Sequence, residues 1–172
     1  MASGLRLFPH HTGIWEGTYT RINPDGSVRD KWKSRLTMRF EGERLYHQVN
    51  EYMWDDGHKE CLDFGVCEFN ENWELIFDNP RISGKAWETQ DSVVLTWHYK
   101  NRPGSMLYEL IDLIGPDKKH RIRVWKWSQG DEFQGLTMID EHKLADESEI
   151  DPQFWIDLPN NRTNGQPSRS DN

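Results

Sequence analysis

Residues that favour turns recur along this chain about every ten positions, and this spacing limits the possible folds more than any other feature of the sequence. Clusters of asparagine, aspartate, glycine and proline mark these places, as in residues 23–26 (NPDG), 55–57 (DDG) and 102–104 (RPG). The segments between the clusters are long enough for β-strands but too short for the helices of about 10–15 residues that separate the strands of α/β proteins. The sequence therefore predicts an all-β protein, built as a sandwich or as a barrel.

Alternation of side chains supports the prediction of strands. Between Lys31 and Phe40, large apolar side chains such as Trp32 alternate with basic ones such as Lys33, as expected for a strand with one buried and one wet face. Ten candidate strands follow from such patterns: 13–22, 27–40, 44–54, 58–69, 73–78, 82–88, 92–99, 105–114, 120–128 and 132–141. The connections are short, so we expect an antiparallel meander. Closing it into an up-and-down barrel of about 8–10 strands leaves no exposed edge, which favours a barrel over a sandwich.

The chain of 172 residues has the length of one domain with a tail. We expect the barrel to occupy residues 1–145. A short helix is predicted over residues 146–158, because apolar side chains recur there every four positions. Residues 159–172 contain no large apolar side chain and are predicted to form a disordered tail.

Net charge and hydropathy exclude several classes of partner. The formal charge of −8 disfavours binding to nucleic acid or to an anionic membrane surface, both of which need a basic face. No apolar run is long enough to span a bilayer or has the form of a secretory signal, so we expect a cytoplasmic protein. Cys61 and Cys67 lie about 20 Å apart if a strand joins them, which is too far for a disulfide, and both are predicted to be free thiols. The sequence indicates no oligomeric state.

The first predicted strand opens with the pattern GIWEG at residues 13–17. At the head of a meander of short strands, this G-x-W pattern resembles the opening of lipocalin-like proteins of the calycin superfamily, which have a barrel like that of fatty-acid-binding proteins. In residues 13–22, 46–57, 86–88 and 139–141, the chain is more closely similar to an uncharacterised family of lipocalin-like domains related to the phycobiliprotein lyases of cyanobacteria. The resemblance extends over roughly residues 10–145 and indicates the fold far more than a reaction.

The resemblance implies a barrel in which Trp15 closes the narrow end, with a basic side chain from a late strand stacked on the indole. Arg121 and Arg123 are the candidates for that partner, and cation–π attraction favours the contact. A contact with the ligand is the alternative role for Trp15. Gly17 is expected to permit a close approach of backbone or a bend in the strand.

Segment 44–54 carries hydrogen-bonding side chains among rings on both faces, with His47 and Glu51 on one and Gln48 and Asn50 on the other. Either orientation places polar groups inside the barrel, where they need partners. A cavity that holds a ligand or water would supply them, and the alternative is that one face is exposed at an edge. The expected lining of the cavity consists of rings and one arginine: Tyr46, Tyr52, Trp54, Trp87, Trp97, Trp125, Trp127 and Arg123.

Three residues are candidates for acid/base chemistry in that cavity: His98, His47 and Glu109. His98 alternates with Trp97, so it points inward only if that ring points outward. Glu109 lies within an apolar run, where it is either paired with an arginine or held with a raised pKa. The chain has no phosphate-binding loop, nucleophile elbow or zinc-ligand spacing, so we expect neither a cofactor nor a metal.

The predicted function is the binding of a small apolar or aromatic molecule inside the barrel. The alternative is a cofactor-free lyase, isomerase or cyclase of specialised metabolism, and the sequence does not decide between a carrier and an enzyme. A bilin-chromophore lyase and a haem-binding barrel are less favoured, the latter because no motif ties His120 or His142 to iron. A protein-interaction module that uses the acidic region after Asp140 is a further alternative.

Overall fold

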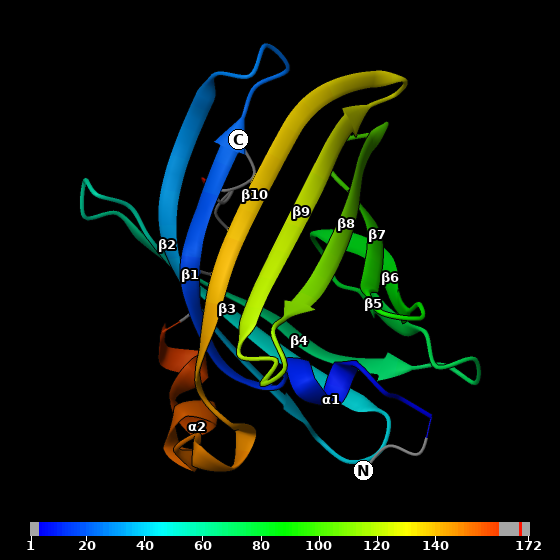
Figure 1. Ribbon diagram of the computed structural model, residues 1–172, viewed down its shortest axis with the longest axis vertical. Coiled ribbons are helices and arrows are strands. Elements are labelled where there is room, and N and C mark those ends of the chain that lie inside the picture. The colour runs from blue at the N-terminus through cyan, green and yellow to red at the C-terminus, as the bar shows by residue number, and fades with distance from the viewer. Residues whose placement is uncertain (1–3, 162–168, 170–172) are drawn as a thin grey trace.

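The computed structural model describes residues 4–161 and residue 169, and it shows ten antiparallel strands closed into a barrel (Figure 1). Each strand pairs with its neighbours in the chain, and the last strand pairs with the first. The strands are β1 (Gly13–Ile22), β2 (Val28–Phe40), β3 (Leu45–Met53), β4 (Lys59–Phe69), β5 (Leu75–Asp78), β6 (Ile82–Glu88), β7 (Val93–Tyr99), β8 (Ser105–Ile114), β9 (His120–Gln129) and β10 (Glu132–Ala145). The predicted up-and-down barrel is confirmed.

The turn signals locate nearly all strand ends. Nine strands begin and end within two residues of the predicted bounds, and only β10 extends four residues further, to Ala145. The extension has a tertiary cause, because Lys143 and Ala145 pair with Trp15 and Ile14 and so complete the closure of the barrel. The sequence pattern of β10 does not predict this pairing.

The alternation predicted for β2 is confirmed. Trp32, Leu36 and Met38 are buried, whereas Lys31 and Lys33 are exposed. The inward side chains of the other strands join them in one aromatic and aliphatic core. Because side chains alternate between the two faces of a strand except at a bulge, the phase of each strand also decides which of its polar residues enter the barrel.

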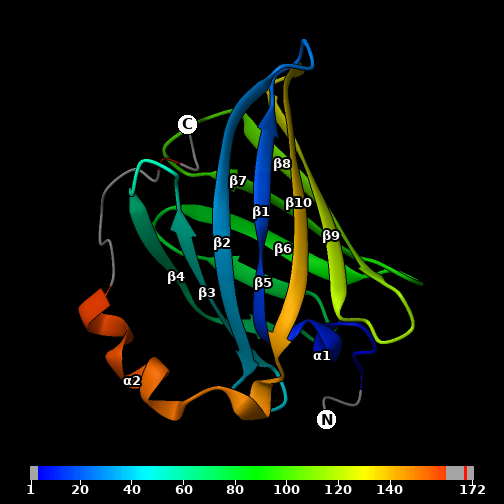
Figure 2. The same cartoon turned by 60° about the vertical axis from the view of Figure 1, so that its left-hand side comes forward.

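A short helix that the sequence pattern did not predict, α1 (Phe8–His11), lies across one end of the barrel (Figures 1 and 2). The carboxylate of Glu88 accepts hydrogen bonds from the backbone N–H groups of Leu7 and Phe8 at 2.6 and 2.7 Å, which satisfies donors at the start of this helix. The Phe8 ring packs edge-on against Phe69, with centroids 4.9 Å apart. Four residues are too few to show a helical period, so contacts with the strands specify α1.

The segment after the barrel contains a single turn of 3₁₀ helix, η1 (Glu147–Glu149), and the helix α2 (Pro152–Asn161). Figure 2 shows α2 outside the barrel, at the same end as α1. Trp155 of α2 packs on the ring of His47, with centroids 4.8 Å apart. The helix enters the segment predicted to be a disordered tail by three residues, and the rest of that segment, except Arg169, lies outside the described residues.

The sheet is weakest where β4 meets β5, because only two residue pairs join these strands. Just before this point, β4 has a bulge, in which Phe64 and Gly65 lie opposite the single residue Gln48 of β3. Gly65 has φ +74°, a conformation that an L side chain rarely adopts. The bulge shifts the alternation, so that Phe64 and Cys67 both line the interior although they are three residues apart.

Neither Cys61 nor Cys67 forms a disulfide, as predicted, and both side chains are half-buried. Over the described part of the chain, no helix has both the length and the apolar character that crossing a lipid bilayer requires.

Candidate functional site

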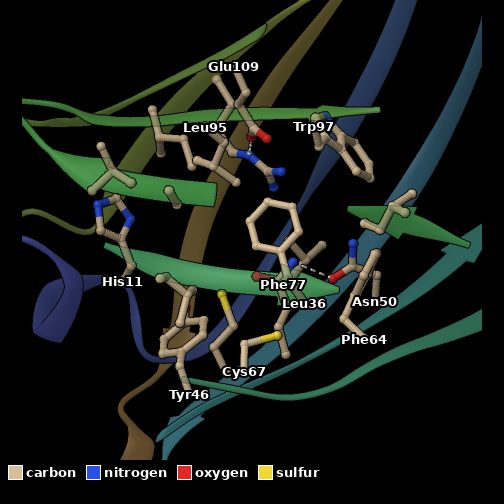
Figure 3. Close-up of a pocket in the computed structure, with 18 of the residues that line it drawn as sticks. His11, Leu36, Tyr46, Asn50, Phe64, Cys67, Phe77, Leu95, Trp97 and Glu109 are labelled. Carbon is tan, nitrogen blue, oxygen red and sulfur yellow. Dashed lines mark hydrogen bonds and ion pairs between the residues drawn. The ribbon is translucent and has the colours of Figure 1, made fainter. Parts of the chain in front are cut away.

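The barrel encloses a cavity of about 100 Å³ (Figure 3). Its wall is mainly apolar and is built from rings and aliphatic chains contributed by α1 and by strands β2 to β9. The residues that line the cavity include Leu36, Tyr46, Phe77, Ile82 and Trp97. An engineered cavity of about 150 Å³ in another protein binds benzene, so this space is of the size that a one-ring molecule occupies.

Five of the eight residues predicted to line the cavity do so: Tyr46, Tyr52, Trp97, Trp125 and Arg123. Trp127 and Trp54 are buried in the barrel but lie beyond the cavity, because Trp127 stacks on Tyr99 and Trp54 stacks on Trp32. Trp87 is half-buried and lies under the ammonium group of Lys85, outside the cavity lining.

Among the predicted acid/base residues, only Glu109 lines the cavity. Trp97 faces the interior, so its neighbour His98 is exposed on the outer surface. His47 alternates with the inward-facing Tyr46 and is instead covered by α2 on the outside, where its Nε2 lies 2.8 Å from a carboxylate oxygen of Asp63. The pleat thus keeps both histidines out of the cavity.

A buried network of two arginines and two glutamates forms one side of the cavity. Arg123 donates from Nε to Glu109 at 2.6 Å and from Nη1 to Glu141 at 3.2 Å. Arg121 donates from Nε to the other oxygen of Glu141 at 2.6 Å. Burial alone would lower the pKa of Arg123, but the two carboxylates and Tyr19 raise it well above its usual value. Glu109 is thus paired with an arginine, which is the first of the two alternatives.

Arg121 is also the basic partner that was expected for Trp15. Its guanidinium carbon lies 4.3 Å from the centre of the Trp15 ring, and both side chains are buried. Trp15 is fully buried and does not line the cavity, as expected for a plug of the barrel rather than for a contact with a ligand. A Cβ added to Gly17 would lie 2.1 Å from the carbonyl oxygen of Asp140, so the expected close approach of backbone is confirmed as well.

The polar side chains of β3 are inside the barrel, as the alternation of segment 44–54 required. Gln48 donates to Asn50 at 2.8 Å, and Asn50 donates to the hydroxyl of Tyr52 at 2.8 Å. Burial raises the pKa of Tyr52 to about 12, so the hydroxyl stays protonated near neutral pH. The alternative, in which this face is exposed at an edge, is wrong.

Several buried polar atoms in the cavity wall have no hydrogen-bond partner among the described residues. These atoms are Nη2 of Arg121, the indole Nε1 of Trp97, the indole Nε1 of Trp125 and Nδ1 of His11. A buried donor without an acceptor costs about 1–3 kcal/mol. Such atoms are rare in folded proteins, and these four belong to residues that line one cavity.

His11 enters the cavity from α1 and was not among the predicted site residues. Its ring lies on the opposite side of the cavity from Trp97 in Figure 3. Burial, and then the charges of Arg121 and Arg123, lower the pKa of His11 well below 6.5. The imidazole is therefore neutral near pH 7 and has one ring nitrogen available to a ligand.

This histidine predicts a specific dependence of stability on pH. The unfolded chain protonates His11 near pH 6.5, but the folded protein keeps it neutral to lower pH. Below about pH 6.5 the unfolded state therefore binds more protons than the folded state. The free energy of unfolding decreases as the pH is lowered, by up to about 1.4 kcal/mol per pH unit. Replacing His11 by glutamine is expected to remove this component.

Urea unfolding at several pH values between about 5 and 7.5 measures the effect. The matched control is His98→Gln, because His98 is exposed and its replacement should leave the slope unchanged. An unaltered slope in the His11→Gln variant contradicts the assignment.

The only group of three candidate metal ligands found among the described residues lies outside the cavity. His120, Asp140 and His142 project from β9 and β10, and their ligand atoms lie within 4.8 Å of one another. The two imidazoles are stacked with centroids 4.4 Å apart, and His120 contacts Asp140 at 2.8 Å. Both histidines are thus on the outer surface, where neither can bind the iron of a haem inside the barrel.

Sequence reasoning missed His11 and Arg121 as cavity residues. For Arg121 a signal was present, since it alternates with Arg123 and Trp125 on one face of β9. For His11 the sequence contained no such signal, because the position of His11 depends on a helix of four residues that the sequence pattern does not indicate.

Comparison with known proteins places this architecture in a family. Residues 1–146 match the family described as "Domain of unknown function (DUF3598), N-terminal". A solved protein of unknown function from the DUF3598 family of Nostoc punctiforme PCC 73102 is 15% identical with a TM-score of 0.64, over 81% of this chain and 49% of that one. This chain therefore spans about half the length of that relative.

Two further solved structures share the fold. The protein Rv2717c of M. tuberculosis is 14% identical with a TM-score of 0.60, over 83% of this chain and 98% of that one. An S-type phycobiliprotein lyase of Guillardia theta is 15% identical with a TM-score of 0.57, over 83% and 92%. Among curated proteins, none matches the sequence significantly. The predicted membership of an uncharacterised family is confirmed, and the likeness to a phycobiliprotein lyase is confirmed for the fold.

Proposed function

The chain belongs to the DUF3598 family, and from its cavity we propose that it binds a small apolar or aromatic molecule inside the barrel. One observation carries the proposal: an apolar interior space has buried polar atoms in its wall that lack partners. A packed core would place apolar atoms there, because unpaired buried donors destabilise a folded protein.

The size of the cavity limits the ligand. A space of about 100 Å³ accommodates a one-ring molecule without rearrangement, whereas a four-ring pigment needs wall side chains to move. This consideration favours a small ligand over the bilin that the name of the solved lyase suggests.

Fluorescence of the native tryptophans tests the proposal directly. Trp97 and Trp125 line the cavity, so a bound ring is expected to change their emission in a saturable way. We expect binding of one-ring compounds to raise the unfolding midpoint as their concentration rises. Absence of saturable binding across a panel of one-ring and two-ring compounds would show that the proposal is wrong.

We expect the ligand to enter through the seam between β4 and β5. A second hollow lies on the outside of this seam, and Phe64 and Cys67 line both that hollow and the inner cavity. These two side chains therefore separate the interior from solvent at the point where the fewest residue pairs hold the sheet. The bulge interrupts the strand pairing beside Phe64, and a Cβ added at Gly65 would meet no other atom within 4 Å.

Replacing Phe64 by alanine is therefore expected to raise the association rate of a ligand by about tenfold, within the range by which such rates vary among variants. Replacement by tryptophan is expected to lower the rate. Stopped-flow fluorescence measures both rates. Phe133→Ala, which removes an exposed ring on β10, is the control and should have no effect. Equal rates in all four proteins would place the entrance elsewhere.

A cofactor-free lyase, isomerase or cyclase is the second candidate, and one observation favours it. His11 is neutral, reaches the cavity and has a ring nitrogen without a partner, which suits a general base. In this case the base is His11 rather than His98 or His47. Once a ligand is known, mass spectrometry of that ligand after incubation decides, since His11→Gln should abolish conversion and retain binding.

A further inference from the structure

We propose that the ligand is a neutral carbonyl compound, such as a ketone, a quinone or an ester, because the unpartnered atoms of the cavity are donors and its buried charges are balanced. This inference rests on the proposed function and names the chemical class of its ligand.

The first step concerns the donors. Nη2 of Arg121 and the indole nitrogens of Trp97 and Trp125 carry hydrogens, have no acceptor in the described structure, and belong to buried side chains. None of these three groups can accept a hydrogen bond, because guanidinium and indole nitrogens only donate. His11 adds a nitrogen that accepts or donates according to its tautomer.

The second step concerns three acceptors in the wall that already receive hydrogen bonds. Glu109 accepts from Arg123 at 2.6 Å, and the amide oxygen of Asn50 accepts from Gln48 at 2.8 Å. The hydroxyl of Tyr52 accepts from Asn50 at 2.8 Å. These three acceptors are therefore occupied, whereas the three donors of the first step have no acceptor in the described structure.

The third step concerns charge. Arg121 and Arg123 are neutralised by Glu109 and Glu141, so the fully buried network carries no net charge. Arg81 is half-buried at the cavity and has interactions of its own. A carboxylate ligand would add an unbalanced charge beside Glu109, at a cost that a neutral molecule does not incur.

Ketones, quinones and esters combine the required properties. The carbonyl oxygen of such a compound accepts two hydrogen bonds and donates none. An alcohol of the same shape adds a hydroxyl hydrogen that finds few free acceptors. A hydrocarbon leaves the indole and guanidinium donors unsatisfied. We expect the carbonyl to lie at Trp97 and Trp125 or at Arg121, with the apolar part against Leu36 and Ile82.

Four one-ring compounds of similar shape test the inference: acetophenone, 1-phenylethanol, ethylbenzene and benzoate. Calorimetric titration is expected to show that acetophenone binds about tenfold more tightly than ethylbenzene and 1-phenylethanol, which is the effect of about one satisfied donor. Benzoate is expected to bind most weakly of the four.

Nuclear magnetic resonance of the ¹⁵N-labelled indole groups identifies the donor. Acetophenone should shift the Nε1–H signal of Trp97 or Trp125, and ethylbenzene should produce a much smaller shift. Trp97→Phe and Trp125→Phe assign the signals and keep a ring in each place, and near-ultraviolet circular dichroism confirms that both variants are folded. Trp127 is the matched control, because its Nε1 already donates to Thr137 at 2.9 Å and should not respond.

The outcomes separate the two proposals. Equal affinity for ethylbenzene and acetophenone, or tightest binding of the alcohol or of benzoate, overturns the carbonyl class and leaves the proposed function standing. Failure of all four compounds to bind at millimolar concentration overturns the proposed function together with this inference. Preference for acetophenone that disappears in at least one of the two phenylalanine variants and persists in Trp127→Phe supports both.

Discussion

Replacing Glu141 by glutamine is expected to lower the free energy of unfolding by about 3–5 kcal/mol. The change leaves two buried guanidinium groups with only one carboxylate to balance their charge. Glu141 is fully buried and accepts hydrogen bonds from Arg121 at 2.6 Å and from Arg123 at 3.2 Å. Glutamine has almost the same shape, so the change removes charge without opening a space. Water does not reach these atoms, and added salt should therefore screen the loss only slightly.

Urea or guanidinium unfolding, monitored by tryptophan fluorescence, measures this loss. The matched control is Glu16→Gln, since Glu16 also pairs with an arginine, Arg35, but its side chain is 47% exposed and that of Glu141 is 0% exposed. An exposed pair contributes about 0–1 kcal/mol. Similar small losses in the two variants would contradict a buried charge network in the barrel.

The replacement of Trp15 by alanine has the second large expected effect. Trp15 is fully buried, its Nε1 donates to the carbonyl oxygen of His11 at 2.9 Å, and Arg121 lies over its ring. Removal of so large a core ring costs about 3–5 kcal/mol. Because the same indole joins α1 to the strands, we expect the variant to lose ordered packing at this end of the barrel.

Trp155→Ala provides the comparison. Trp155 contacts Arg39 and His47 on the outside of the barrel and is only half-buried, so its loss should cost about 1 kcal/mol. Denaturant midpoints of the two variants measure the difference. If Trp15→Ala were no more destabilising than Trp155→Ala, the role of Trp15 as plug of the barrel would be wrong.

The strands could be predicted because the signals that define them are local. Turn residues and alternation lie within a few positions of each other, and they locate nine of the ten strands to within two residues. The end of β10 could not be located in this way, since its last residues are strand only by pairing with Ile14 and Trp15. The helix α1 was missed for the same reason, because Glu88 and Phe69 hold it in place.

The sequence predicted several of the rings that line the cavity but not the histidine that reaches it. Rings such as Tyr46, Trp97 and Trp125 were expected at the cavity because of their abundance and alternation, and they line it. The histidines were misjudged because the pattern of one strand does not show which of its two faces is inside. A shift of the strand register by one residue would exchange the places of Trp97 and His98.

The order of residues by itself determined that this chain forms ten short strands, that they close as an antiparallel meander, and that rings fill the interior. These properties depend on turn residues, on alternation and on composition, which are all local. The tertiary structure decided which face of each strand points inward, how the bulge at Phe64 and Gly65 brings both Phe64 and Cys67 to the cavity, and that His11 and Arg121 line the same space. These properties depend on register between strands far apart in the chain, and register arises only when the whole sheet closes.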